Sequence, residues 1–135
     1  VQRHRMHYDS YDYKHCRAVP WLSGACILLL RDVFESAGGF DENYFLYMED
    51  MDLSLRVHWL GCVNFYLPEA VVLHHFGKSE RIENLIRNPH YRNSLLYYFR
   101  KNFSPLHFWL ARFYLALASY RSQGADIRTS RSAGH

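Results

Sequence analysis

The sequence predicts an α/β fold followed by C-terminal helices. Short segments rich in β-branched and aromatic residues, which are typical of strands, occur between segments whose apolar residues recur at helical spacing. Glycine or proline separates most of these segments. The chain has 135 residues, of which 49% are hydrophobic, and this is enough for one domain with a single core.

The N-terminal part is expected to contain a connector, a strand and a short helix. Residues 1–18 are polar and have no clear period, so we expect a loop. Residues 19–30 end in a continuous apolar run, which predicts a buried strand. Residues 31–37 can form a short helix, and Gly38 and Gly39 would end it.

A second helix and two further strands are expected in the middle of the chain. Leu53, Val57 and Leu60 share one helical face after an acidic cluster, and Gly61 marks the end of that helix. Strands are predicted for two segments that a proline separates, 62–67 and 71–75.

The C-terminal part is expected to be helical. A long helix is predicted over 79–102, with an interruption near Asn88 and Pro89 because proline resists a helix interior. Residues 104–120 are apolar but fewer than the ~20 residues that span a bilayer. They form either an interfacial amphipathic helix or a helix packed on its own domain. Residues 122–135 are small and polar, and we expect a disordered end.

Charge is distributed unevenly along the chain. Residues 1–80 carry 7 Lys/Arg and 11 Asp/Glu, whereas residues 81–135 carry 9 Lys/Arg and 2 Asp/Glu. The basic second part indicates a surface for an anionic partner, and charge alone does not separate lipid from nucleic acid. The basic residues are dispersed and match no known nucleic-acid-binding module, so we expect no nucleic-acid partner.

The candidate chemistry lies in the middle of the chain. Glu49, Asp50 and Asp52 place three carboxylates at the start of a helix, and His74 and His75 follow an apolar strand. Carboxylates and imidazole brought together suit a divalent-metal or general-base site. Helix capping also explains acidic residues at this position, although three carboxylates in four residues repel one another unless a cation or proton is shared. Successive strand residues point to opposite faces, so only one of the two histidines can face the acidic cluster.

These residues resemble the C-terminal half of family 2 glycosyltransferases, and most closely bacterial rhamnosyltransferase-like enzymes. The resemblance covers about residues 19–120. It rests on a combination of positions that are individually weak: Trp21, Gly24, Ala25, Arg31, Phe34, Gly38, Gly39, Phe40, Asp41, Glu42, Phe45, Tyr47, Glu49, Asp50, Asp52, Leu53, Arg56, Gly61, Tyr66, Pro68, Glu69, Ala70, His74, Gly77, Ser79, Tyr98, Phe99, Arg100 and Lys101.

The resemblance implies a GT-A fold, which is a nucleotide-sugar-binding α/β domain with a mainly parallel sheet. It implies that Asp50 is the general base that deprotonates the acceptor hydroxyl in an inverting transfer. It favours His74 over His75 as a ligand of a divalent metal, Mg²⁺ or Mn²⁺. The substrate-binding residues that it implies are Trp21, Gly24, Gly38, Gly39, Glu49 and Asp52.

The resemblance also implies that part of the enzyme is absent from this chain. Family members carry an N-terminal half with nucleotide-binding βα units and a metal-binding D-x-D motif, and nothing here matches that half. The string from Asp50 to Asp52 occupies the place of the family's ED motif instead. We therefore expect residues 19–79 to be the C-terminal part of a catalytic domain and residues 80–121 to be a helical, basic region. We expect the chain to be inactive alone.

The leading hypothesis is the acceptor-side, catalytic-base half of a metal-dependent inverting glycosyltransferase. Its donor would be a nucleotide sugar such as dTDP-rhamnose, and its acceptor a growing glycan or a lipid-linked sugar. We expect it in the cytoplasm, with its basic region at the inner face of the membrane. The alternative hypothesis is a non-catalytic module that binds a membrane or a protein partner.

Overall fold

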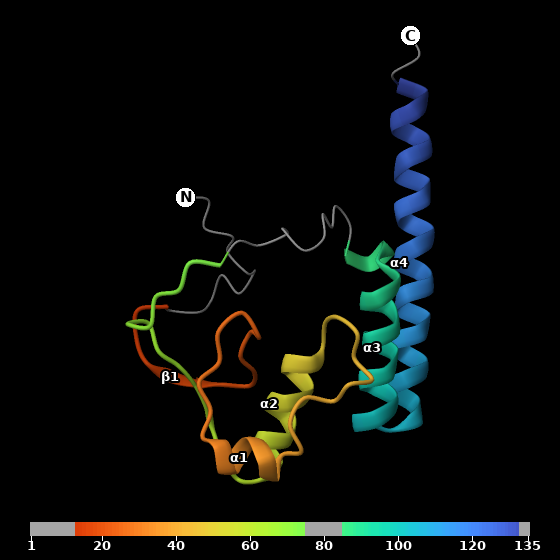
Figure 1. Cartoon of the computed structure of the whole chain (residues 1–135). Coiled ribbons are helices and arrows are strands. Elements are labelled where there is room, and N and C mark those ends of the chain that lie inside the picture. The colour runs from red at the N-terminus through yellow and green to blue at the C-terminus, as the bar shows by residue number, and fades with distance from the viewer. Residues whose placement is uncertain (1–12, 75–84, 133–135) are drawn as a thin grey trace.

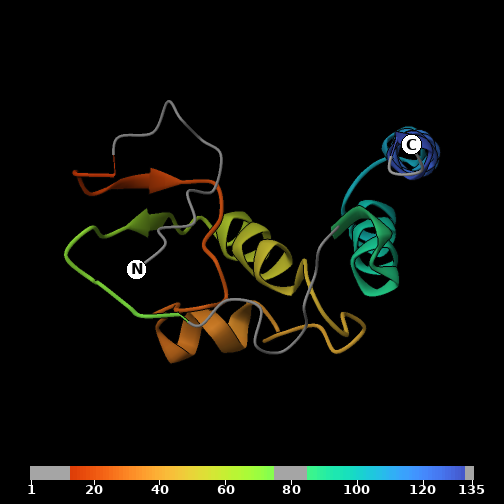
Figure 2. The same ribbon diagram turned by 90° about the horizontal axis from the view of Figure 1, so that it is seen from above.

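The computed structural model describes residues 13–74 and 85–132. Within these residues it contains a small sheet and several helices, in the order β1 (Arg17–Val19), α1 (Arg31–Ser36), α2 (Glu49–Trp59), β2 (Asn64–Tyr66), the 3₁₀-helix η1 (Leu85–Arg87), α3 (Pro89–Asn102) and α4 (Pro105–Ser132). In Figures 1 and 2, α2 lies between the strands on one side and the α3–α4 pair on the other. The mixture of helices and a small sheet confirms the expected α/β character.

The sheet differs from the one expected. It has two strands among the described residues, and β1 pairs with β2 in antiparallel register, with Arg17 opposite Tyr66 and Val19 opposite Asn64. A mainly parallel sheet is therefore not present in the described residues. Antiparallel pairing leaves one face of each strand free of covering helices, and accordingly Phe65 of β2 is 53% exposed.

The prediction of a buried strand over 19–30 is wrong. Only Val19 of that segment belongs to a strand, and Leu28 and Leu30 are 94% and 75% exposed. An apolar run forms a buried strand only where neighbouring strands pair its backbone and other elements cover its faces. Among the described residues β1 has β2 as its sole strand partner, so the rest of the run follows an irregular path.

The predictions for the two helices that follow are largely confirmed. α1 ends before Gly38–Gly39, and Gly61 follows the end of α2, all three glycines having positive φ between 67° and 81°. Leu53 and Val57 are buried in α2 at 3% exposure each. Leu60, which was expected on the same buried face, is 48% exposed because it caps the helix instead of continuing it.

The second half of the predicted strand pair is not formed. β2 covers 64–66 of the predicted 62–67. Residues 71–74 form no strand, and Val71 and Leu73 are 89% and 73% exposed. His75, the last residue of the predicted strand, lies outside the described residues.

The predicted break near Asn88 and Pro89 separates the 3₁₀-helix η1 from α3, which begins at Pro89. Asn88 is the N-cap of α3, and its side chain accepts hydrogen bonds from His90 N at 2.8 Å and Tyr91 N at 3.1 Å. Proline suits the first helical position, since its fixed φ fits the helix and it lacks only an N–H that would have no partner there. Residues 79–84 of the predicted helix lie outside the described residues.

The C-terminal helix is longer than the sequence predicts. α4 runs to Ser132, so residues 122–132, expected to be disordered, are helical. Figure 1 shows α3 packed beside the N-terminal part of α4, and the remainder of α4 extends beyond it. Within the part of the chain that the structure describes, none of the helices combines the length and apolar character that crossing a bilayer requires.

Buried apolar side chains form two small groups. Leu53 and Val57 lie on α2 and Tyr44 lies in the loop before it, while Ala111 and Leu115 of α4 lie against α3. α3 contacts both groups, since the ring of Tyr97 lies 4.9 Å from that of Tyr44 between centroids and Arg92 Nη1 donates to the Leu115 carbonyl oxygen at 3.4 Å. The packing of α3 therefore decides how the two groups of helices are joined.

Candidate active site

Asp50 lies in the first turn of α2, where two backbone N–H groups hold its carboxylate. Gly24 N donates to Oδ2 at 2.8 Å, and Met51 N donates to Oδ1 at 2.8 Å. A carboxylate has about four acceptor positions on its two oxygens, so each oxygen retains one for a further donor. The site therefore presents an oriented carboxylate that can accept a proton from a hydroxyl group.

The segment that contains Gly24 is attached to α2 at further points. Leu22 N donates to Ser54 Oγ at 3.2 Å, and Asn64 Nδ2 of β2 donates to the Ser54 carbonyl oxygen at 3.3 Å. Ser54 lies four residues after Asp50, so both residues lie on the same face of α2. Gly24, which was expected to bind substrate, is placed where it orients the carboxylate of Asp50.

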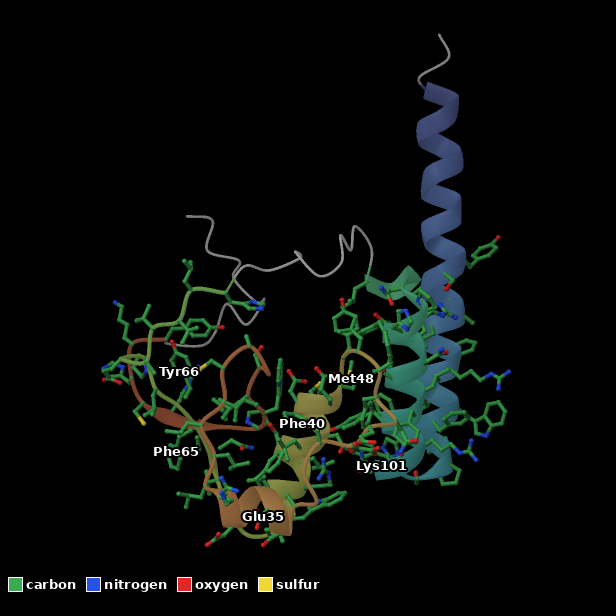
Figure 3. The ribbon with its side chains drawn as sticks, in the orientation of Figure 1. Glu35, Phe40, Met48, Phe65, Tyr66 and Lys101 are labelled. Carbon is green, nitrogen blue, oxygen red and sulfur yellow. The ribbon has the colours of Figure 1, made fainter. Side chains whose placement is uncertain are left out.

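The chain enters α2 through two residues in the left-handed conformation. Tyr47 has φ 69° and Met48 has φ 70°. This region costs a residue with a Cβ roughly 1–2 kcal/mol, and it persists only where the surrounding structure holds it. Glu49 and Asp50 follow directly, and Figure 3 labels Met48 at this end of α2. The structure thus stores backbone strain next to the residue that the sequence predicts to be the base.

One face of α3 holds the strained loop. Ser94, which is 4% exposed, donates from Oγ to the Leu46 carbonyl oxygen at 2.7 Å. Three aromatic pairs flank this hydrogen bond, with ring centroids 4.6 to 5.8 Å apart: Phe45–His90, Tyr47–Tyr91 and Tyr44–Tyr97. Positions 90, 94 and 97 follow one another at helical spacing on a single face. The path of the loop before Asp50 is therefore set by α3.

Asp52 is completely buried, and its carboxylate joins α2 to α3. Oδ2 accepts from Arg56 Nε at 2.7 Å and from Lys101 Nζ at 2.9 Å, while Oδ1 accepts from Asn102 Nδ2 at 3.0 Å and from Tyr44 OH at 3.2 Å. Figure 3 labels Lys101 on the side of α3 that faces α2. Side chains of this chain occupy the acceptor positions of Asp52, which the resemblance implies to be a substrate-binding residue.

The same lysine also binds a carboxylate of the loop before α2. Lys101 Nζ lies 2.7 Å from Asp41 Oδ2, which accepts a second hydrogen bond from Tyr97 OH at 3.0 Å. Burial raises the pKa of both Asp41 and Asp52, but hydrogen bonds from Lys101 and other donors outweigh it and hold both pKa values below the ordinary one. Burial lowers the pKa of Lys101, and its bonds to the two carboxylates raise it overall. This cluster is therefore ionised at neutral pH.

Glu49 differs from its two acidic neighbours. Its Oε2 atom is buried, and it has no hydrogen-bond partner among the described residues. Burial raises the pKa of Glu49, and the neighbouring charge of Asp50 raises it further. Glu49 therefore has, like Asp50, acceptor capacity left over, and its role in substrate binding stays a prediction.

The glycine turn is not brought to Asp50. The turn after α1 lies beside Arg56, whose Nη1 donates to the Ala37 carbonyl oxygen and is 3.8 Å from the position of a Cβ on Gly38. Arg56 is six residues after Asp50, which corresponds to about 9 Å along a helix. Glu35 of α1 and Met48 accordingly lie at opposite ends of α2 in Figure 3.

The remaining predicted residues have less defined surroundings. Gly39 has φ 67°, and a Cβ there would lie 3.4 Å from the ring of Phe34, so its contacts are with α1. Trp21 is half-buried and directly precedes Leu22, whose N–H is bonded to Ser54. Trp21 thus lies in the segment that reaches Asp50, whereas Gly39 does not.

The described residues do not assemble a metal site. His74, the predicted ligand, is the last residue of the first described segment. Within residues 13–74 and 85–132, no group of three or more His, Cys, Asp or Glu side chains is placed to hold a metal ion. Asp52 does not supply a ligand, because four side chains already bind its oxygens. The residues present do not fit a metal ion by themselves.

Sequence reasoning missed the contribution of α3 to the site. Ser94, Tyr97 and Asn102 were not singled out, and Lys101 was noted only as part of the family resemblance. The available signal was the recurrence of polar residues at 94, 97 and 101, spaced three and four apart on one helical face. That spacing identifies a face but not the loop it contacts, which is 48 residues away in the sequence at Ser94–Leu46.

Comparison with known proteins gives relatives of one kind. The chain is 38% identical over 125 residues to N-acetylglucosaminyl-diphospho-decaprenol L-rhamnosyltransferase of Mycobacterium tuberculosis, an alignment that covers 85% of this chain and 39% of that protein. It is 37% identical over 63 residues to rhamnosyltransferase WbbL of Escherichia coli, covering 47% of this chain and 24% of that protein. It is 38% identical over 65 residues to O-antigen biosynthesis protein RfbC of Myxococcus xanthus, covering 47% of this chain and 5% of that protein.

These relatives confirm the resemblance to rhamnosyltransferase-like glycosyltransferases. The chain spans 39% of the length of the mycobacterial relative and less of the other two. No family model matches the chain, and no solved structure matches it.

Proposed function

We propose that this rhamnosyltransferase-like glycosyltransferase chain supplies the acceptor-side, catalytic-base part of an inverting sugar transfer. The observation that carries the proposal is the placement of Asp50. Its carboxylate is fixed by Gly24 N and Met51 N at the start of α2, directly after the strained loop, and it retains acceptor positions for a substrate hydroxyl.

The proposed reaction is a single displacement. Asp50 accepts the proton of the acceptor hydroxyl, and the acceptor oxygen forms a bond to the anomeric carbon of the donor sugar. The bond between that carbon and the diphosphate oxygen breaks, and its electron pair leaves with the nucleoside diphosphate. Attack from the face opposite the leaving group inverts the anomeric configuration. General-base assistance of this kind contributes roughly 10²–10⁴-fold to the rate.

The substrates are proposed from the names of the relatives. An L-rhamnosyltransferase and a second rhamnosyltransferase support a nucleotide-activated rhamnose such as dTDP-rhamnose as donor. The name of the mycobacterial relative, which includes N-acetylglucosaminyl-diphospho-decaprenol, supports a lipid-linked sugar as acceptor. We also propose a GT-A fold for the whole enzyme. Its nucleotide-binding units have no counterpart among the described residues, so we expect no transfer by this chain alone.

Metal dependence is a separate part of the proposal and rests on the family resemblance. His74 would be a ligand of Mg²⁺ or Mn²⁺ together with residues outside this chain. We expect Mn²⁺ bound to a complete enzyme to give an altered electron paramagnetic resonance signal that His74→Ala abolishes. An unchanged Mn²⁺ signal in that variant would remove His74 from the metal site without affecting the role of Asp50.

The outward face of α4 supports an attachment to anionic membrane. Its exposed apolar residues span an arc of about 140° at 100° per residue, on the side away from Ala111 and Leu115, which are buried against α3. These residues are Leu106, Trp109, Leu110, Phe113, Tyr114, Leu117 and Tyr120. Residues 85–125 contain no Asp or Glu, and the guanidinium of exposed Arg112 lies 5.3 Å from the ring centroid of Trp109 on this face. Aromatic, apolar and cationic groups together suit the headgroup region of the cytoplasmic leaflet.

The proposal is tested in a chimera in which this chain replaces the segment that it matches in the mycobacterial rhamnosyltransferase. We expect rhamnose transfer to the lipid-linked acceptor, and a loss of kcat of at least about 100-fold in Asp50→Asn with donor binding retained. Asp32→Asn is the matched control, because Asp32 is an exposed aspartate in the first turn of α1. Circular dichroism establishes that both variants are folded.

Two results would contradict the proposal. Turnover by Asp50→Asn close to that of the unmodified chimera would exclude Asp50 as the base. A folded chimera that binds donor but transfers no sugar, combined with membrane binding by the chain itself, would favour the alternative of a non-catalytic membrane-binding module.

A further inference from the structure

A pocket lies between the loop before α2 and the face of α3 that holds it. Its empty volume is about 620 Å³, part of which is open to solvent. The residues that line it are Asn43, Phe45, His90, Asn93, Ser94 and Tyr97. Two segments that lie far apart in the sequence thus form its walls, and neither wall belongs to the residues that the sequence assigned to a substrate pocket.

The lining favours an uncharged, hydroxyl-rich ligand. It contains two amide side chains and two hydroxyl groups, together with the rings of Phe45 and His90, and it contains no Lys, Arg, Asp or Glu. Amides and hydroxyls donate and accept hydrogen bonds without charge, as sugar hydroxyls do. The lining has no Lys or Arg to pair with a diphosphate, and at the N terminus of α3 the Asn88 side chain already accepts from the N–H groups of His90 and Tyr91.

Two of the lining side chains, Asn43 and Tyr97, are held in place before any ligand binds. Tyr97 OH donates to Asp41 Oδ2 at 3.0 Å, and Asn43 Nδ2 donates to Asp41 Oδ1 at 2.7 Å, so one carboxylate orients both side chains. The side-chain oxygen Oδ1 of Asn43 remains available as an acceptor for a ligand. Within the described residues, the Asn93 side chain makes no hydrogen bond. Phe45 is 78% exposed, with its ring 4.6 Å from that of His90 between centroids. Groups fixed in advance reduce the entropic cost of binding.

The pocket is close to the proposed base along the chain. Phe45 precedes Asp50 by five residues, so their Cα atoms are at most ~18 Å apart even in a fully extended chain. We propose that this pocket is a subsite for an uncharged sugar unit of the acceptor. The inference rests on the proposed function, because the transfer reaction requires an acceptor glycan to lie beside Asp50.

The test is sugar binding by this chain, followed by amide chemical shifts in ¹⁵N-labelled protein. N-acetylglucosamine is the uncharged probe, and dTDP is the charged comparison. We expect millimolar binding of the sugar with shifts at Phe45, Asn93 and their neighbours. Phe45→Ala and Asn93→Ala should each weaken it at least about tenfold, a free-energy change of about 1.4 kcal/mol. Phe65→Ala, an exposed phenylalanine of β2, is the matched control and should leave binding unchanged.

The outcomes separate the subsite from the proposed function, because the binding measurement needs no turnover. Absence of sugar-dependent shifts, shifts confined to other residues, or equal displacement by dTDP would each overturn the subsite. If the chimera described above transfers rhamnose under any of these outcomes, the function stands and the subsite falls. If the sugar binds here while a folded chimera is inactive, the subsite stands and the function falls.

Discussion

Lys101 Nζ lies 2.9 Å from Asp52 Oδ2, so an ion pair with a fully buried carboxylate joins α3 to the helix that carries the proposed base. Asp52 is two residues after Asp50 on α2. The orientation of the first turn of α2 therefore depends on contacts made by α3, a helix for which the sequence predicts no substrate-binding residue.

Loss of the lysine should destabilise the fold. Lys101→Met removes one of the two cations paired with the buried carboxylate of Asp52 and leaves Arg56 in place, so we expect a cost of up to about 3 kcal/mol, the lower end of what breaking a buried pair from one side costs. Urea unfolding should show this decrease in the free energy of unfolding. Arg100→Met is the matched control, since Arg100 is an exposed neighbour, and it should change stability by less than about 0.5 kcal/mol. Equal effects of the two substitutions would contradict the structural role of Lys101.

Acid should weaken the same cluster. The pKa values of Asp41 and Asp52 are lower in the folded protein than in the unfolded chain, so the unfolded state binds more protons as pH falls. The stability that these groups contribute is present above the ordinary carboxyl pKa of about 4 and is lost below it. Urea midpoints measured from pH 6 down to pH 2 should fall, and Lys101→Met should flatten that dependence. A urea midpoint that stays constant down to pH 2 would contradict the contribution of these two carboxylates to stability.

Gly61 should be required for its backbone conformation alone. It has φ 81°, and a Cβ at this position would meet nothing within 4 Å. Gly61→Ala should therefore cost roughly 1–2 kcal/mol through left-handed strain, without any steric contact. Gly24→Ala is the comparison, because the added Cβ would make only an ordinary contact at 3.4 Å with Asp50. Thermal unfolding that ranks Gly24→Ala as the more damaging change would refute this reasoning.

Ser94 should control the mobility of the loop before the base. Ser94→Ala leaves the buried hydrogen bond to the Leu46 carbonyl oxygen unmade, at a cost of about 1–3 kcal/mol. Hydrogen exchange should accelerate at residues 47–50 and remain unchanged in α4. Ser36→Ala, which alters an exposed serine of α1, serves as the control. Uniform acceleration across the chain would indicate general destabilisation instead of local release.

The outward face of α4 should bind anionic vesicles. Phosphatidylglycerol vesicles should retain the chain in sedimentation, phosphatidylcholine vesicles should retain much less, and salt should weaken the binding. Phe113→Asp should abolish retention, and Phe65→Asp on β2 should not. A stable dimer in light scattering that Phe113→Asp dissociates, without vesicle binding, would assign the face to a second copy of the chain.

Local features of the site could be predicted from sequence where the cause is local. The end of α1 at Gly38, the acidic first turn of α2 and the end of α2 near Gly61 all follow from short-range backbone preferences. The irregular path of residues 20–30, where the sequence predicts a strand, could not be predicted, since an apolar run specifies a buried strand only when partner strands are present. The burial of Asp52 could not be predicted either, because its partners Lys101 and Asn102 lie 49 and 50 residues further along the chain.

By itself, the sequence determined the position of Asp50 at a helix start, because a helix start depends on residues close together in the chain. It also determined the kinship with rhamnosyltransferase-like glycosyltransferases, because that kinship depends on the order of residues alone. Only the tertiary structure separated the three acidic residues. Asp50 is oriented by the backbone N–H of Gly24. The carboxylate of Asp52 accepts hydrogen bonds from Lys101 and Asn102 of α3, and Glu49 retains a buried oxygen with no hydrogen-bond partner among the described residues. The physical reason is that a carboxylate's role depends on which donors reach it, and here half of the donors to Asp50 and Asp52 come from distant segments of the chain.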